Sequence, residues 1–186
     1  MTSMRWLEVR RHSLRKPGGG SQLSQAGVDL ARRIGASMGP FEWVATSVSP
    51  RARETAIAMG FAVDQELVTL VDEDAPAAEF EASRWWETPQ PFVALAQIVR
   101  AGGPALALGR AIVTLWRDLV IALPEGGSAL VIGHSGQIEV ALVTCFLEAD
   151  HAAWGGPFAC CEGARLSFDG DPPRFTAVAS LREPAR

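Results

Sequence analysis

The sequence predicts an α/β fold, with a three-layer α/β/α arrangement in which helices cover both faces of a mostly parallel sheet. Two strand-like segments near the N-terminus are each followed by a helical pattern, which gives the order β-α-β-α. Parallel strands joined by right-handed crossovers are the usual outcome of that order. A later run, residues 129–133, is apolar throughout, as a central strand buried on both faces should be.

The first unit joins a strand to a helix through a glycine-rich loop. Residues 6–9 favour a strand, and residues 16–20 have the composition of a loop. Ser24 is a suitable N-cap for the helix, whose apolar residues recur at four-residue steps until Gly35 or Gly39. We therefore expect the first strand to end just before this loop.

A second unit of the same kind follows. Residues 41–47 predict a strand. Ser49 followed by Pro50 is typical of a helix start, because the cap residue comes directly before proline at the first helical position. Gly60 ends this helix.

Residues 61–103 carry weaker signals, and we interpret them as a small helical insertion that caps the site. The stretch 63–71 has enough strand character for one strand, and the acidic residues 72–76 predict a turn. Short helices are expected at 80–86 and 92–100.

The rest of the chain again alternates helices with strands. We expect helices at 105–123 and 137–146, and strands at 129–133, 164–168 and 175–179. No linker along the chain marks a second domain, so a single domain is predicted for the whole chain.

Composition supports one globular domain spanning residues 1–186. The chain is 48% hydrophobic and 20% charged, and its net charge of −4 with no Tyr argues against a nucleic acid partner. No apolar run approaches the length of a membrane span, so no membrane partner is expected. Three cysteines without metal-ligand spacing fit reduced thiols, and we expect a cytoplasmic location.

Basic and imidazole side chains follow three of the predicted strands. Arg11 and His12 follow the first, Arg51 and Arg53 the second, and His134 the apolar strand. The carboxyl ends of parallel strands meet at one edge of a sheet, where ligands bind. Charged side chains are almost never buried without partners, so this cluster predicts an anion-binding site.

Phosphate is the anion that suits this cluster best. The guanidinium of arginine matches phosphate in a bidentate manner, and the start of the helix at Pro50 adds free backbone N–H groups. A neutral imidazole can attack phosphorus and carry the phosphoryl group covalently. The sequence has no Walker loop and no cluster of acidic ligands, so we expect neither a metal nor another cofactor.

Four motifs that carry these residues occur in order between residues 5 and 145. They are Arg11-His12-Ser13, then residues 23–27 (Leu-Ser-Gln-Ala-Gly), residues 49–56 (Ser-Pro-Arg-Ala-Arg-Glu-Thr-Ala) and residues 133–136 (Gly-His-Ser-Gly). In kind, order and approximate separation they resemble the motifs of the histidine phosphatase superfamily, the phosphoglycerate mutase-like proteins.

The resemblance implies a role for each site residue. It makes His12 the phosphorylated nucleophile, and Arg11, Arg51 and His134 the phosphate pocket, with His134 also taking part in catalysis. Ser13 stands where the family usually has glycine, and we expect it to join the phosphate-binding residues.

The family also supplies a carboxylic acid that protonates the leaving group. The sequence offers Asp72, Glu73, Asp74 and Glu79 in the corresponding region, and none of them lies in a clear motif. Such a donor needs a raised pKa. We favour Glu73 among the four.

The sequence-based hypothesis is a metal-independent phosphatase that acts on a phosphorylated small molecule or a phosphoprotein. Two alternatives stay open, a phosphoglycerate-type mutase and a non-catalytic phosphate-binding scaffold. A hydrolase with Ser135 as nucleophile is disfavoured, because Gln137 replaces the last glycine of the nucleophile elbow. The substrate and the oligomeric state are left open.

Overall fold

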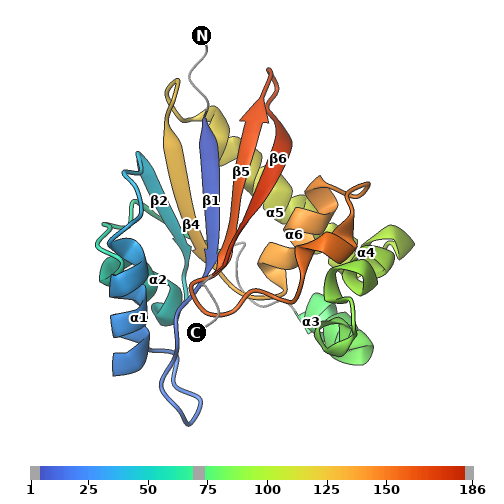
Figure 1. Cartoon of the computed structure of the whole chain (residues 1–186), viewed down its shortest axis with the longest axis horizontal. Coiled ribbons are helices and arrows are strands. Elements are labelled where there is room, and N and C mark those ends of the chain that lie inside the picture. Colours follow the sequence, from blue (N-terminus) through green and yellow to red (C-terminus); the bar gives the residue numbers. More distant parts are fainter. Residues whose placement is uncertain (1–4, 69–73, 183–186) are drawn as a thin grey trace.

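The computed structural model describes residues 5–68 and 74–182, which form one unit around a single sheet (Figure 1). The strands are β1 (Trp6–Arg11), β2 (Trp43–Ser47), β3 (Gln65–Leu67), β4 (Ser128–Gly133), β5 (Gly163–Asp169) and β6 (Arg174–Leu181). The helices are α1 (Gln25–Gly35), α2 (Pro50–Ala58), α3 (Asp74–Ser83), α4 (Pro91–Ala101), α5 (Pro104–Ile121) and α6 (Gln137–Cys145), with the short 3-10 helices η2 (Trp85–Glu87) and η3 (His151–Trp154).

The sheet has the strand order β3-β2-β4-β1-β5-β6. The first four strands of that order are parallel, whereas β5 runs antiparallel to both β1 and β6. The prediction of a mostly parallel sheet is therefore confirmed. The central strand β4 lies between two parallel strands, β2 and β1. Its neighbour β1 lies between the parallel strand β4 and the antiparallel strand β5.

Helices cover both faces of the sheet, which confirms the three-layer architecture. The apolar strand β4 is buried at every residue and serves both layers. Leu130 and Ile132 pack toward α1 and α2, while Ala129 and Val131 pack toward α4, α5 and α6. A strand with both faces covered needs apolar side chains at every position, and this explains its unbroken apolar run.

The two N-terminal helices begin where the cap residues predict. The side chain of Ser24 accepts a hydrogen bond from the Gly27 N–H at the start of α1, and Ser49 precedes Pro50 at the start of α2. Helix α1 approaches the chain before it very closely, because a Cβ at Gly27 would lie 2.0 Å from the carbonyl oxygen of Leu14. Only glycine fits at that position.

The region 61–103 differs from its prediction in two places. The strand expected within 63–71 is only three residues long, Gln65–Leu67, and pairs with β2 as an edge strand of the sheet. The acidic turn is wrong from Asp74 onward, where α3 begins. Proline is tolerated in the first turn of a helix, because its missing N–H would have no partner there, and this explains why Pro76 does not prevent α3.

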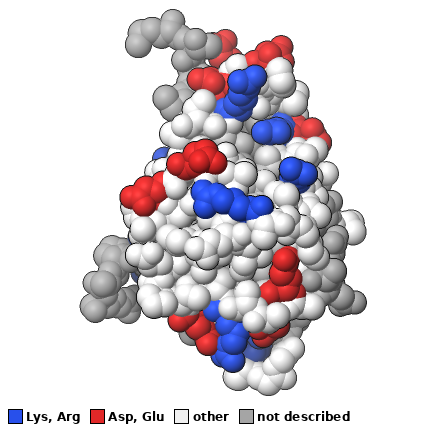
Figure 2. All heavy atoms as spheres, turned by 90° about the vertical axis from the view of Figure 1, so that its right-hand side faces the viewer, with Lys and Arg blue, Asp and Glu red and all other residues white. Residues whose placement is uncertain are grey.

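The segment that leaves the sheet therefore consists of α3, η2 and α4. These elements pack against α5 and α6, on the side of the molecule opposite to α1 and α2 (Figure 1). Figure 2 shows the face on this side, where acidic and basic side chains lie beside one another among broad uncharged areas.

Taken singly, none of the helices within residues 5–68 and 74–182 is long and apolar enough to cross a membrane. Helices α4 and α5 meet that criterion only as a pair, and the pair is bent by 97°.

Candidate active site

Two histidines meet at the carboxyl edge of the parallel strands. The register of β1 and β4 places Arg11 opposite Gly133, so the residues that follow them, His12 and His134, leave the sheet side by side. Their ring centroids are 5.2 Å apart and the rings are inclined by 62°. The predicted convergence of the strand ends is therefore found in the structure.

Arg51 lies between the two imidazoles. Its Nε donates to Nε2 of His12 at 3.1 Å, and its Nη2 lies 3.2 Å from Nδ1 of His134. Arg53, on the same helix, points away and pairs with Glu66 at 3.5 Å on the surface. One arginine of α2 thus belongs to the site and the other does not.

The hydrogen bonds of His12 define its tautomer. Nδ1 lies 2.7 Å from the carbonyl oxygen of Ser13. A carbonyl oxygen can only accept, so Nδ1 carries the proton. Nε2 therefore keeps a lone pair, and the N–H of Arg51 points at it. The nucleophilic nitrogen, Nε2 of His12, therefore lies next to the positive charge of Arg51.

His134 is held by a strand end as well. Its Nε2 lies 2.7 Å from the hydroxyl of Ser47, the last residue of β2. Because the guanidinium of Arg51 can only donate, Nδ1 of His134 accepts and Nε2–H donates to Ser47. Strands β1, β2 and β4 and helix α2 together fix the orientation of both rings.

Both imidazoles are neutral at pH 7. Burial is the main cause, and it lowers the pKa of His12 and of His134 from 6.5 to about 4. The positive charges of Arg51 and Arg11 lower both values further, while the Ser13 carbonyl partly opposes the shift at His12. A neutral imidazole is the form that can attack phosphorus.

Ser13 lies outside this cluster of polar side chains. It is fully buried, and its hydroxyl donates to the Gly27 carbonyl at 2.7 Å, which ties β1 to α1. Its backbone N–H donates to the hydroxyl of Thr55 at 2.9 Å, and Thr55 in turn donates to the carbonyl of Arg51. These bonds fix His12 relative to Arg51, and a contact of Ser13 with phosphate stays a prediction.

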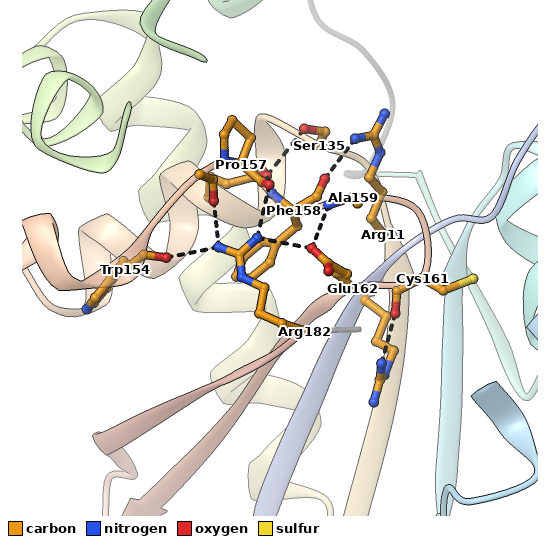
Figure 3. Close-up of polar contacts among 12 residues, drawn as sticks. Arg11, Ser135, Trp154, Pro157, Phe158, Ala159, Cys161, Glu162 and Arg182 are labelled. Carbon is orange, nitrogen blue, oxygen red and sulfur yellow. Dashed lines mark hydrogen bonds and ion pairs between the residues drawn. The ribbon is translucent and has the colours of Figure 1, made fainter. Parts of the chain in front are cut away.

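Arg11 reaches the site from the other side and is held by a loop that precedes β5. Its Nη1 donates to the carbonyl oxygen of Phe158 at 2.7 Å (Figure 3). Its Nε is buried and has no hydrogen-bond partner among the described residues. The guanidinium is close enough to both imidazoles to lower their pKa values, so it adds a second positive charge to the site.

Glu139 is a residue of this region that the sequence analysis missed. Its side chain is fully buried at the start of α6. One carboxylate oxygen accepts from the N–H of Phe158 at 3.0 Å and from the Ser135 hydroxyl at 3.3 Å, and the other accepts from the N–H of Gly136 at 2.6 Å. Burial raises its pKa. The spacing of Gly136 and Glu139, which matches the acidic half of a capping box, was the available signal.

The loop of residues 154–162 is also fixed from the C-terminal strand. Arg182 donates to the carbonyls of Trp154 and Pro157 and pairs with Glu162 at 3.0 Å (Figure 3). Its guanidinium lies over the ring of Phe158, 4.3 Å from the centroid. Glu139 of α6 and Arg182, the residue after β6, thus hold the loop whose carbonyl orients Arg11.

The structure describes only some of the four candidate proton donors. Glu73, the favoured one, and Asp72 lie outside the described residues. Asp74 is the first residue of α3. Glu79 accepts from the N–H of Ala105 at 2.7 Å and so serves the first turn of α5, where backbone N–H groups lack partners within the helix. That bond accounts for Glu79 without a role in catalysis.

A cavity of about 420 Å³ opens beside Arg11. It lies between the strand-end loop that follows β4 and the elements α3 and η2. The lining residues are Arg11, Ala77, Phe80, Glu81, Trp85, Trp86, Ser135, Gly136 and Pro157. Within the described parts of the chain, no cluster of three or more His, Cys, Asp or Glu side chains could hold a metal ion.

No protein-family model and no curated protein matches the sequence. Solved structures do match it over nearly the whole chain. A mycobacterial glucosyl-3-phosphoglycerate phosphatase in complex with VO3 has a TM-score of 0.66 at 17% identity, and the match covers 96% of this chain and 98% of that one. The chain has the fold of the histidine phosphatase superfamily.

Two further structures with this histidine phosphatase fold carry different activities in their names. Phosphoserine phosphatase from Entamoeba histolytica has a TM-score of 0.64 at 16% identity, with 96% of this chain and 98% of that chain covered. Phosphoglycerate mutase from Bacillus anthracis has a TM-score of 0.61 at 16% identity, with 97% and 93% covered. The same fold thus occurs in phosphatases and in a mutase.

Proposed function

We propose that this protein is a phosphatase that hydrolyses a phosphomonoester through a phosphoryl group carried on His12. The observation that carries the proposal is the lone pair on Nε2 of His12, which faces the guanidinium of Arg51 in a buried site. The names of the matching phosphatases support the same class of reaction.

The first step forms a bond between Nε2 of His12 and phosphorus and breaks the bond between phosphorus and the ester oxygen. The leaving oxygen takes a proton from a carboxylic acid, for which Glu73 stays our prediction. Positive charge that develops on the ring is stabilised by the Nδ1–H bond to Ser13, and Arg51 and Arg11 balance the charge of the phosphoryl oxygens.

In the second step a water molecule attacks phosphorus and gives one proton back to the carboxylate, the bond to Nε2 breaks, and inorganic phosphate leaves. A mutase would instead return the phosphoryl group to another hydroxyl of the substrate. We favour the phosphatase of the two. A phosphoglycerate would bring a carboxylate to the cavity beside Arg11, and the described residues of its lining include no second cation. The guanidiniums supply the positive charge that metal ions supply in other phosphoryl transfer enzymes, so we also propose that the reaction needs no metal.

The test is hydrolysis of a panel of simple phosphomonoesters with a chelator present. We expect turnover by the wild-type protein and a loss of at least about a thousandfold for His12→Ala, since covalent catalysis then has no nucleophile. Arg53→Ala is the matched control, because this arginine lies on the same helix as Arg51 and faces the surface. Activity that requires a divalent cation, or that survives His12→Ala, would overturn the proposal.

A further inference from the structure

The cavity beside Arg11 is where the leaving group of a phosphomonoester would lie. Arg11, Ser135 and Gly136 contribute to its lining and are immediate neighbours, in sequence, of His12 and His134. For a phosphomonoester bound at the two histidines, this cavity is a neighbouring space for the leaving group. The chemistry of the remaining lining then decides which alcohols fit.

One wall of the cavity consists of aromatic side chains. Phe80 and Trp86 are partly exposed in it, and Trp85 is buried behind them. The rings contact one another edge to face, with centroids 5.9 Å apart for Trp85 and Trp86 and 6.4 Å apart for Phe80 and Trp85. Trp85 also packs on Phe92 in the core, at 6.4 Å. The wall is thus anchored in the core and presents a preformed aromatic surface.

The wall opposite the aromatic side chains includes Gly136, which lies close to Phe80. A Cβ built on Gly136 would come within 3.5 Å of the ring of Phe80. Gly136, with a φ of +85°, therefore lies close to Phe80 and bounds the cavity at this point. The partly exposed rings of Phe80 and Trp86 suit an aromatic group better than a branched polyol, because aromatic pairs favour close offset or edge contacts.

Charge and hydrogen bonding in the lining favour the same type of group. Among the described residues of the lining, Arg11 is the only cation and Glu81 the only carboxylate. The Ser135 hydroxyl donates to Glu139. A carboxylated leaving group would meet Glu81 without a compensating cation, and a polyhydroxylated one would find few free hydrogen-bond partners.

We infer that this cavity selects phosphomonoesters of aromatic alcohols without a negative charge on the leaving group, a class that includes tyrosine phosphate within a peptide. The inference rests on the phosphatase function proposed above, because the cavity matters only if the phosphoryl group is transferred to His12. Phe80 and Trp86 are its specificity-determining residues.

The test compares benzyl phosphate with glycerol 1-phosphate. Both release an aliphatic alkoxide, so the intrinsic reactivity of the ester is similar and the ring is the main difference. We expect kcat/KM for benzyl phosphate to be at least about tenfold higher in the wild-type protein, as the burial of one aromatic ring would give. Trp86→Ala should lower this ratio about tenfold, and Trp86→Phe should retain most of it.

Trp43→Ala is the control, because Trp43 is a partly exposed tryptophan at the other end of β2, in a different cavity; it should leave the ratio unchanged. Glu81→Gln should raise kcat/KM for 3-phosphoglycerate several-fold. Equal use of the two esters, or an unchanged ratio in folded Trp86→Ala, overturns the inference.

Phosphoramidate separates failure of this inference from failure of the proposed function. Its leaving group is ammonia, which does not need the aromatic wall. If phosphoramidate phosphorylates His12 but benzyl phosphate is not preferred, only the inference about the cavity is wrong. If His12 is not phosphorylated by any donor, the proposed function fails as well.

Discussion

The state of one nitrogen atom, Nε2 of His12, determines what the site can do. The proton of this ring is held on Nδ1 by the Ser13 carbonyl, and burial keeps the second nitrogen unprotonated. Arg51 then places a donor against the lone pair at 3.1 Å. A buried imidazole of this kind combines an available lone pair with a charge that attracts phosphate.

The lowered pKa values predict the titration of the histidines. In a protein with three histidines, NMR spectra of the ring nitrogens can be assigned and followed with pH. We expect His12 and His134 to titrate with midpoints near 4, because burial disfavours the protonated form. Both rings should therefore stay neutral from pH 7 down to about pH 5.

The protein unfolded in urea provides the control, since its histidines should titrate near 6.5. Midpoints of about 6.5 for His12 and His134 in the folded protein would contradict the account. They would mean that the two rings are accessible to water and charged in half of the molecules at that pH.

The residues of the site differ in how well the sequence predicts them. His12, Arg51 and His134 follow strands and lie in recognisable motifs, so topology alone brings them together. Ser13 is next to His12 in sequence, but the direction of its hydroxyl depends on where α1 packs, which no local pattern specifies. Glu139 was missed because a glutamate in the first turn of a helix is usually a solvated cap.

At the scale of elements, the loop of residues 154–162 matters as much as the regular structure. It has no periodic pattern, and its conformation depends on bonds from Glu139 in α6 and Arg182 at the end of β6. These bonds present the Phe158 carbonyl to Arg11. The phosphate-binding role that we propose for Arg11 therefore depends on residues from two parts of the chain that are distant in sequence.

This dependence predicts the effect of Glu139→Gln. A glutamine keeps one acceptor oxygen, so one of the bonds to Gly136 and Phe158 must be lost, and its NH2 group faces a donor. We expect the affinity for vanadate, an analogue of the pentacoordinate phosphorus, to fall about tenfold, the equivalent of about 1.4 kcal/mol. Isothermal titration calorimetry measures this change.

Glu42→Gln is the matched control for that measurement. Glu42 also accepts from a backbone N–H, that of Ser128, but at the amino end of β4. It should leave vanadate affinity unchanged. An equal loss for both variants would show a general effect on stability, and no loss for Glu139→Gln would show that the loop does not orient Arg11.

Strand and helix patterns predict most elements because the patterns are local. The unbroken apolar run of β4 and the caps of α1 and α2 are confirmed at nearly the expected positions. The region before α4 was less predictable, since β3 is a short edge strand and α3 contains a proline in its first turn. Packing on α5 and α6 defines that region more than its own sequence does.

At the scale of the whole molecule, the sheet collects residues from the two halves of the chain at one edge. Strands β1, β2 and β4 are parallel neighbours, so His12, Arg51 and His134 meet although more than eighty residues separate the last two. The cap formed by α3 and η2 adds the aromatic wall on the far side of Arg11. The proposed phosphate chemistry and the proposed selection of the leaving group thus depend on different parts of the fold.

The attachment site of the phosphoryl group tests the central claim most directly. Protein labelled with 15N-histidine, treated with phosphoramidate and studied by NMR, would show through the coupling of 31P to 15N which ring nitrogen bears phosphorus. We predict a bond to Nε2 of His12, with Nδ1 still protonated and bonded to the Ser13 carbonyl. Phosphorus on Nδ1 of His12, on His134, or on no histidine at all would contradict the account.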